Sequence, residues 1–206
     1  MTKRNYQKEL EQLLENLKSG NKIPKLLLHS CCAPCSSYVL GYLSPYFNIT
    51  VLYYNPNISP KEEYLFRKKE QIDLLFKIKA KNTISFLDCD YEDFKFYQIT
   101  SGLENEKEGG KRCFNCYRLR LEKAAVTAKA LGFEFFGSTL SVSPYKNAIW
   151  LNAIGESLEN KYSVSFLISD FKKKDGYKKS IELSKQFNLY RQNYCGCIFS
   201  KKQIAK

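Results

Sequence analysis

The sequence lacks the marks of several large protein classes. No apolar run approaches the ~18 residues of a membrane-spanning helix, and residues 1–20 are charged and amphipathic, without the apolar core of a secretory signal. The chain contains no internal repeat, low-complexity tract or obvious linker. Its 8 cysteines among 206 residues are too sparse for a disulfide-rich secreted scaffold. These absences predict a cytoplasmic protein with a single domain spanning residues 1–206 and no membrane partner.

The composition is that of a folded chain with an excess of positive charge. Hydrophobic residues make up 44% and aromatic residues 15% of the sequence, which is enough for an ordinary core and excludes global disorder. The 33 Lys and Arg against 21 Asp and Glu give a formal net charge of +12. Such an excess suits a polyanionic partner such as nucleic acid. A lysine-rich genome produces the same composition, so charge alone leaves both interpretations open.

Hydrophobic periodicity predicts an alternation of strands and helices. Apolar residues recur at helical spacing over residues 4–19, and the apolar run 25–29 is typical of a buried strand. Further strands are predicted at 48–55, 84–88, 133–137 and 164–169, and further helices at 38–43, 61–79, 115–131, 146–158 and 176–187. This order indicates an α/β fold with a doubly wound, mostly parallel sheet, a Rossmann-type three-layer arrangement. Within it we distinguish an N-terminal helix (1–22), an irregular cysteine-containing insertion (89–116) and a C-terminal tail (188–206).

The cysteines are clustered rather than scattered, and in a reducing cytosol clusters indicate metal or redox chemistry. The first cluster, Cys31, Cys32 and Cys35, directly follows the first predicted strand. Ligands of open α/β sheets bind beyond the carboxyl ends of strands, so this loop lies where a site is expected. Adjacent cysteines form a disulfide only with strained geometry. Cys31 and Cys32 are therefore predicted to supply thiolates to a metal centre.

The second cluster is the CxxC of Cys113 and Cys116. By itself this spacing fits a redox pair or half of a zinc site. Together with Cys31 and Cys32 it supplies four thiolates, which suit a structural Zn²⁺ or a [4Fe–4S] cluster. The spacing does not separate the two metals, although the adjacent cysteines favour iron–sulfur because zinc ribbons use paired CxxC knuckles.

The third cluster is the CxC of Cys195 and Cys197. A disulfide across one residue is strained and easily reduced, which predicts a redox-active pair; two further metal ligands are the alternative.

His29, the only histidine, ends the first predicted strand beside the cysteines. It is a candidate proton donor or ligand, but a packing and hydrogen-bonding role is the commoner one for such a histidine. Cys89 is expected to be a core or loop thiol.

Four segments together resemble the epoxyqueuosine reductase QueH family: LLLHSCCAPCSS, RCFNCYRLRLEKAA, STLSVSPYKN and GYKKSIELSKQFNLYRQNYCGCIFS, spread from residue 26 to residue 200. The resemblance implies a HUP-like fold and reduction of the epoxide of epoxyqueuosine, at the wobble position of tRNA, to queuosine. It places a [4Fe–4S] cluster on Cys31, Cys32, Cys113 and Cys116, and a redox-active disulfide on Cys195 and Cys197. It also implies a second, adjacent iron, for which Cys35 is a candidate ligand because some relatives carry Asp there.

The residues fit this activity. Removing an epoxide oxygen as water takes two electrons, protons and an electrophile, which a cluster, a neighbouring metal and a dithiol can supply. The anticodon stem-loop of the tRNA is the expected partner, since splayed bases stack on aromatic side chains and phosphates bind lysine and arginine. The candidate substrate contacts are Tyr145, Lys146, Lys178, Arg191 and Gln192. Nothing in the sequence identifies the electron donor.

Two other functions remain as alternatives. The first is a zinc-stabilised module that binds tRNA or nucleotides without redox activity, although the loop after the first predicted strand lacks a glycine-rich phosphate cradle. The second is a thiol–disulfide oxidoreductase that works through the CxxC or the CxC, which leaves the adjacent pair Cys31 and Cys32 unexplained.

Overall fold

The computed structural model describes residues 4–204 and is built on a five-stranded sheet in the order β3-β2-β1-β4-β5. β1 (Lys25–His29) is central and pairs in parallel with β2 (Asn48–Tyr53) and β4 (Phe135–Ser138). The edge strands β3 (Ile84–Asp88) and β5 (Ser165–Phe166) pair in parallel with β2 and β4. Every described pairing is parallel, so the predicted sheet is confirmed.

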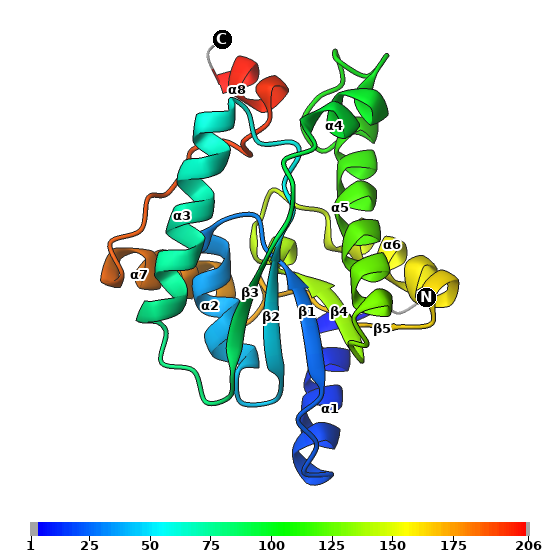
Figure 1. Ribbon diagram of the computed structural model, residues 1–206, viewed down its shortest axis with the longest axis vertical. Coiled ribbons are helices and arrows are strands. Elements are labelled where there is room, and N and C mark those ends of the chain that lie inside the picture. Colours follow the sequence, from blue (N-terminus) through cyan, green and yellow to red (C-terminus); the bar gives the residue numbers. More distant parts are fainter. Residues whose placement is uncertain (1–3, 205–206) are drawn as a thin grey trace.

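Helices lie on both sides of this sheet, which gives the expected three layers (Figure 1). Their bounds are α1 (Tyr6–Ser19), α2 (Ala33–Leu43), α3 (Lys61–Lys77), α4 (Asp93–Thr100), α5 (Lys111–Ala130), the 3₁₀ helix η1 (Thr139–Val142), α6 (Ala148–Tyr162), α7 (Gly176–Gln186) and α8 (Ile198–Ile204). No helix in the described range is long and apolar enough to cross a membrane. Residues 1–3 and 205–206, which the sequence interpretation assigned to the N-terminal helix and the C-terminal tail, lie outside the described residues.

The sheet separates two hydrophobic clusters, and β1 contributes to both. Successive side chains of a strand point to opposite faces. Leu27 joins the cluster formed with α5 and α6, while Leu26 and Leu28 join the cluster formed with α1 and α2. All three leucines are fully buried. The continuous apolar run of β1 follows from this position, because a strand covered on both faces has no solvent side.

Several predicted boundaries were wrong near the cysteines. The helix predicted at 38–43 begins at Ala33, because Pro34 fits the first turn of a helix. The helix predicted at 115–131 begins at Lys111, so both cysteines of the CxxC lie on α5 and the insertion 89–116 is partly helical. The last predicted strand, 164–169, pairs over only two residues. Cys35 and the CxxC therefore lie in the first turns of helices, Cys32 is the N-cap of α2, and the CxC directly precedes α8.

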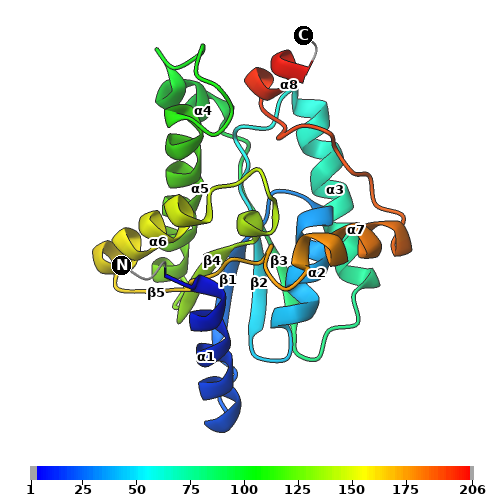
Figure 2. The same ribbon diagram turned by 180° about the vertical axis from the view of Figure 1, so that it is seen from behind.

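The N-terminal halves of α3 and α5 extend past the carboxyl ends of the strands, with α4 and α8 at their far ends (Figure 2). The C-terminal segment passes alongside α3 on its way from α7 to α8. This arrangement gathers four distant parts of the chain beyond the sheet. The position agrees with the rule for ligand sites of open α/β sheets.

Candidate functional site

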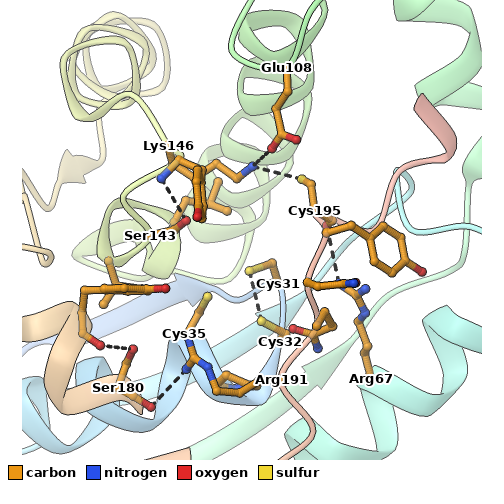
Figure 3. Close-up of a pocket in the computed structure, with 18 of the residues that line it drawn as sticks. Cys31, Cys32, Cys35, Arg67, Glu108, Ser143, Lys146, Ser180, Arg191 and Cys195 are labelled. Atoms are coloured by element: carbon orange, nitrogen blue, oxygen red, sulfur yellow. Dashed lines mark hydrogen bonds and ion pairs between the residues drawn. The ribbon is translucent and has the colours of Figure 1, made fainter. Parts of the chain in front are cut away.

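A cavity of about 360 Å³ lies beyond the carboxyl ends of the strands. Its wall combines the start of α2 with residues from α3, α5, the segment before α6, α7 and the C-terminal segment. Figure 3 shows Lys146 and Cys195 on one side of this cavity and Cys31, Cys32 and Cys35 on the other. Most residues of the predicted site thus face one space; Cys113, Cys116, Cys197 and Lys178 do not line it.

Cys31, Cys32 and Cys35 form a compact three-thiol group. Their sulfur atoms all lie within 4.8 Å of one another, and those of Cys31 and Cys32 are 3.6 Å apart. Hydrogen bonds from the thiols of Cys32 and Cys35 hold the pKa of Cys31 well below its usual range. The same contacts raise the pKa of Cys32 and of Cys35. Cys31 is therefore the most acidic of the three thiols, and the group offers soft sulfur ligands to a metal.

The backbone around this group is held by buried polar side chains. Ser30, directly after β1, donates from Oγ to Oε1 of Gln71 on α3 at 2.7 Å. Oγ of Ser36, in the first turns of α2, lies 2.8 Å from the same oxygen and 3.0 Å from the carbonyl oxygen of Cys32. All these side chains are buried. The turn that presents the three thiols is thus tied to a neighbouring helix.

Cys113 and Cys116 lie three residues apart on the first turns of α5, so they share one face of the helix. Both are buried. The sulfur of Cys113 accepts a hydrogen bond from the Gly109 amide at 3.3 Å, and Cys31 packs against the hydrophobic cluster that contains Cys113. Burial raises the pKa of Cys116 to about 11. The CxxC lies behind the cavity wall and is not part of the three-thiol group.

The CxC brings one thiol to the cavity and keeps the other behind it. Cys195 lines the cavity, whereas Cys197 is buried in a cluster with Cys116. A hydrogen bond from Cys197, supported by the charges of Lys146 and Arg120, holds the pKa of Cys195 well below its usual range. The same hydrogen bond raises the pKa of Cys197. The reduced pair is therefore asymmetric, with its negative charge on the sulfur that faces the cavity.

Gly196 is required between the two thiols. Its φ of +107° is one that other residues rarely adopt, and a Cβ there would meet Nη1 of Arg67 at 3.0 Å and Cγ1 of Ile58 at 3.1 Å. The carbonyl of Gly196 accepts a hydrogen bond from the amide of Ser59 at 3.0 Å. This close approach positions the CxC against the start of α3.

Lys146 joins the CxC to the insertion before α5. Only 8% of Lys146 is exposed, and its Nζ lies 3.1 Å from Sγ of Cys195 and 3.1 Å from Oε1 of Glu108. The hydroxyl of Ser200 donates to the other Glu108 oxygen at 2.9 Å and accepts from the Cys195 amide at 3.2 Å. The Ser200 amide donates to the sulfur of Cys197 at 3.3 Å. Sequence reasoning missed Glu108 and Ser200, because no motif marks either residue.

Three arginines that sequence reasoning also missed are buried around the cysteines. Arg67 donates from Nε to Glu63 at 2.6 Å and lies 5.1 Å from the ring centre of Tyr194. Arg112 donates from Nη1 to the carbonyl oxygens of Leu103, Glu104 and Glu106 at 2.6 to 3.1 Å. Arg120 donates from Nε to the carbonyl of Cys116 at 3.1 Å. An arginine in a charged helix is usually exposed, so the sequence carried no signal for them.

The remaining predicted substrate contacts are distributed unevenly. Tyr145 is 74% exposed on the cavity wall, and Gln192 also lines the cavity. Arg191 lines it while donating from Nη1 to the carbonyl of Ser180 at 3.2 Å. Lys178 is exposed on α7 and does not line the cavity.

His29 is fully buried and lies inside the protein rather than in the cavity. Its Nδ1 is 2.9 Å from Oγ of Ser138, and its Nε2 is 3.1 Å from the carbonyl oxygen of Tyr54 and 3.2 Å from Oδ1 of Asn55. Burial, with the charge of Arg120, lowers its pKa to about 4. A neutral imidazole thus links the ends of β1, β2 and β4.

Cys89 is half-buried and packs against the cluster beneath α5, as expected for a core or loop thiol.

Comparison with known proteins gives the site a context. A family model described as epoxyqueuosine reductase QueH matches residues 26–203. The chain is 43% identical over 200 residues to an epoxyqueuosine reductase QueH of Staphylococcus epidermidis, with 95% of this chain and 84% of the relative covered. It is 41% identical over 200 residues to the protein of that name from Streptococcus pyogenes serotype M1, with 96% and 78% covered.

Two solved structures share the fold at low sequence identity. One is the U34-tRNA thiolase NcsA from Methanococcus maripaludis with its [4Fe-4S] cluster: the TM-score is 0.54 at 15% identity, with 94% of this chain and 67% of that chain covered. The other is a predicted subunit of a tRNA methyltransferase from Methanocaldococcus jannaschii, with a TM-score of 0.50 at 14% identity, covering 78% and 74%. These likenesses show that the chain shares the α/β fold of these two proteins.

Proposed function

The chain belongs to the epoxyqueuosine reductase QueH family of oxidoreductases, and from this premise we propose that its cavity reduces the epoxide of epoxyqueuosine in tRNA to the alkene of queuosine. Both carbon–oxygen bonds of the epoxide break, two electrons and two protons enter, and the oxygen leaves as water. The main support for this proposal is the set of side chains that line the cavity. Three thiols that could ligate a metal face the thiol of Cys195 and the buried Lys146 across one space.

The chemistry of the thiols fits a metal or iron–sulfur cofactor. We assign the ligands of a [4Fe–4S] cluster to Cys31, Cys32, Cys113 and Cys116, and Cys35 is the candidate ligand of an adjacent iron. When bound, these metals supply single electrons and a Lewis acid for the epoxide oxygen. The buried guanidinium of Arg120 next to Cys116 supports an anionic thiolate site at this place.

Cys195 and Cys197, together with Lys146, match the electron and proton balance of the reaction. Oxidation of the Cys195 thiolate and the Cys197 thiol to a disulfide releases the two electrons that epoxide reduction consumes and one of the two protons, and the ammonium group of Lys146 supplies the other. Lys146 holds a proton at Nζ beside Cys195 on the cavity wall. Its ion pair with Glu108 fixes the position of that proton. This chain thus offers both a reductant and a proton reservoir at the cavity.

The mouth of the cavity suits a nucleotide. The exposed ring of Tyr145 offers a stacking surface for a splayed base, and Gln192 and Arg191 offer hydrogen-bond donors beside it. Lys178, outside the cavity, is positioned for phosphate rather than base contacts. The net charge of +12 favours an RNA partner. These features support tRNA as the substrate.

The proposal is tested on anaerobically purified protein. Iron and sulfide analysis together with the visible spectrum is expected to show a brown iron–sulfur protein, absorbing near ~400 nm. The same protein, supplied with a chemical reductant, is expected to convert epoxyqueuosine to queuosine in isolated tRNA. A colourless zinc protein that binds tRNA without conversion would instead indicate a zinc-stabilised binding module. Conversion that survives complete removal of iron would indicate a purely thiol-based reductase.

A further inference from the structure

Arg120 is a buried cation without a carboxylate partner among residues 4–204. Only 1% of the residue is exposed, and no described ion pair includes it. Its Nε donates to the carbonyl of Cys116, and its Nη2 is buried with no hydrogen-bond partner. Removing a charge from water is costly unless an opposite charge compensates it. The surroundings of Arg120 must therefore supply negative charge of another kind.

The other buried cations of the site are compensated differently. Arg67 is paired with Glu63, and Lys146 is paired with Glu108. Arg112 donates to three carbonyl oxygens and lies 4.5 Å from the ring centre of Phe199. Arg120 has one carbonyl contact and lies 5.8 Å from the ring centre of Tyr117, but no described ion pair gives it a carboxylate partner, and it reaches the cavity wall. Its positive charge therefore interacts electrostatically with the nearby cysteines.

Cysteines surround Arg120: its Nε donates to the carbonyl of Cys116, and it lines the same cavity as Cys31 and Cys195. Burial by itself would lower its pKa, yet the charges of Cys116, Cys195 and Cys31 raise that pKa above its ordinary value. These three residues come from the CxxC, the CxC and the loop after β1, so one guanidinium acts on all three cysteine motifs. Arg120 lies on α5, one turn after Cys116, and reaches the cavity wall.

We propose that Arg120 is the fixed counter-charge of the cysteine site and that it raises the reduction potential of the cluster assigned above. The inference rests on the proposed function. Four thiolate ligands make such a cluster anionic, and one-electron reduction adds a further negative charge. A cation held nearby in a water-poor interior stabilises the reduced form more than the oxidised form. Arg120 is thus a positioning residue that tunes the electron transfer without contacting the substrate.

The test is a potentiometric titration of the iron-loaded full chain, followed by electron paramagnetic resonance and visible absorbance. Arg120→Gln and Arg120→Met remove the charge, and Arg120→Lys keeps it. The neutral variants are expected to hold at least tenfold less reduced cluster at a fixed potential, which is a shift of about 59 mV to more negative values for one electron. Arg120→Lys is expected to stay close to the wild type.

Arg118→Met is the matched control. Arg118 lies on the same helix two residues earlier, but its side chain is exposed and its charge is screened by water. Its removal is expected to leave the potential unchanged. An equal shift in Arg118→Met and Arg120→Gln would show that net charge alone matters and would overturn the assignment.

The remaining outcomes also decide the question. Unchanged potentials in both neutral variants overturn the role of Arg120, and so does a shift in Arg120→Lys as large as that in Arg120→Gln. If the neutral variants do not retain the cluster, iron content becomes the readout, and Arg120→Lys must retain the iron that they lose. A wild-type protein without any cluster would refute the proposed function itself, which separates the two failures.

Discussion

The ammonium nitrogen of Lys146 lies 3.1 Å from the sulfur of Cys195 and equally close to a carboxylate oxygen of Glu108. Lys146 is on the segment before α6, Cys195 on the segment between α7 and α8, and Glu108 on the segment before α5. The contact therefore joins three parts of the chain at the cavity wall. Together with the hydrogen bond from Cys197, the charge of Lys146 holds the pKa of Cys195 well below its usual range.

Replacing Lys146 should weaken the thiolate character of Cys195. In Lys146→Met the pKa of Cys195 is expected to rise, because a cation no longer stabilises the negative sulfur, so alkylation at neutral pH should slow several-fold. Lys146→Arg should retain most of the rate. Alkylation by iodoacetamide, with the labelled residue located by mass spectrometry, measures the effect. Equal rates in all three proteins would show that Cys197 alone sets the charge distribution of the pair.

The four assigned ligands should be distinguishable from other cysteines by iron content. Cys31→Ser, Cys32→Ser, Cys113→Ser and Cys116→Ser are each expected to lose the cluster, because a hydroxyl replaces a soft thiolate ligand. Cys89→Ser is the matched control, since Cys89 is half-buried and does not line the cavity. It should retain iron and sulfide at wild-type levels. A full complement of iron in any of the four ligand variants removes that residue from the ligand set.

The CxC should be dispensable for the cluster and necessary for turnover. Cys195→Ser and Cys197→Ser are expected to retain iron but to fail in repeated conversion of epoxyqueuosine-containing tRNA, because neither variant can form the disulfide. Iron analysis beside single- and multiple-turnover assays measures both properties. Loss of iron in both variants would make these cysteines ligands instead. Normal multiple turnover in either variant would refute the relay.

Burial of His29 should make the protein less stable as the pH falls. Its pKa is lowered from 6.5 to about 4 in the folded state, so the unfolded chain takes up the proton first. The stability that neutral His29 provides is complete above pH 6.5 and is lost between pH 6.5 and 4, about 3 kcal/mol in total. His29→Gln should show a flatter decrease of the thermal midpoint over this range. Parallel curves for the two proteins would contradict the prediction.

The local pattern of the chain was sufficient for the sheet and for the cysteine motifs. The run Lys25–His29 predicts a strand buried on both faces, and the alternation of strands with helices predicts a parallel α/β sheet. The spacings of the CxxC and the CxC involve only a few neighbouring residues, so both motifs can be recognised from the sequence alone. The start of α2 could not be predicted from the sequence, because Cys32 at its N-cap makes no capping hydrogen bond and is not a residue type that marks a helix start.

Only the tertiary structure decided which charges meet at the cysteines. Arg120 resembles any arginine of a charged helix in the sequence, and Glu108 resembles any acidic residue of an irregular segment. Packing of α5 against the sheet buries the first, and the C-terminal segment closes over the second through Ser200. The physical reason is that hydrophobic periodicity is a local property, whereas compensation of a buried charge depends on groups brought together from distant parts of the chain. The sequence by itself thus determined the sheet and the cysteine motifs, and the fold determined the electrostatic environment in which those thiols act.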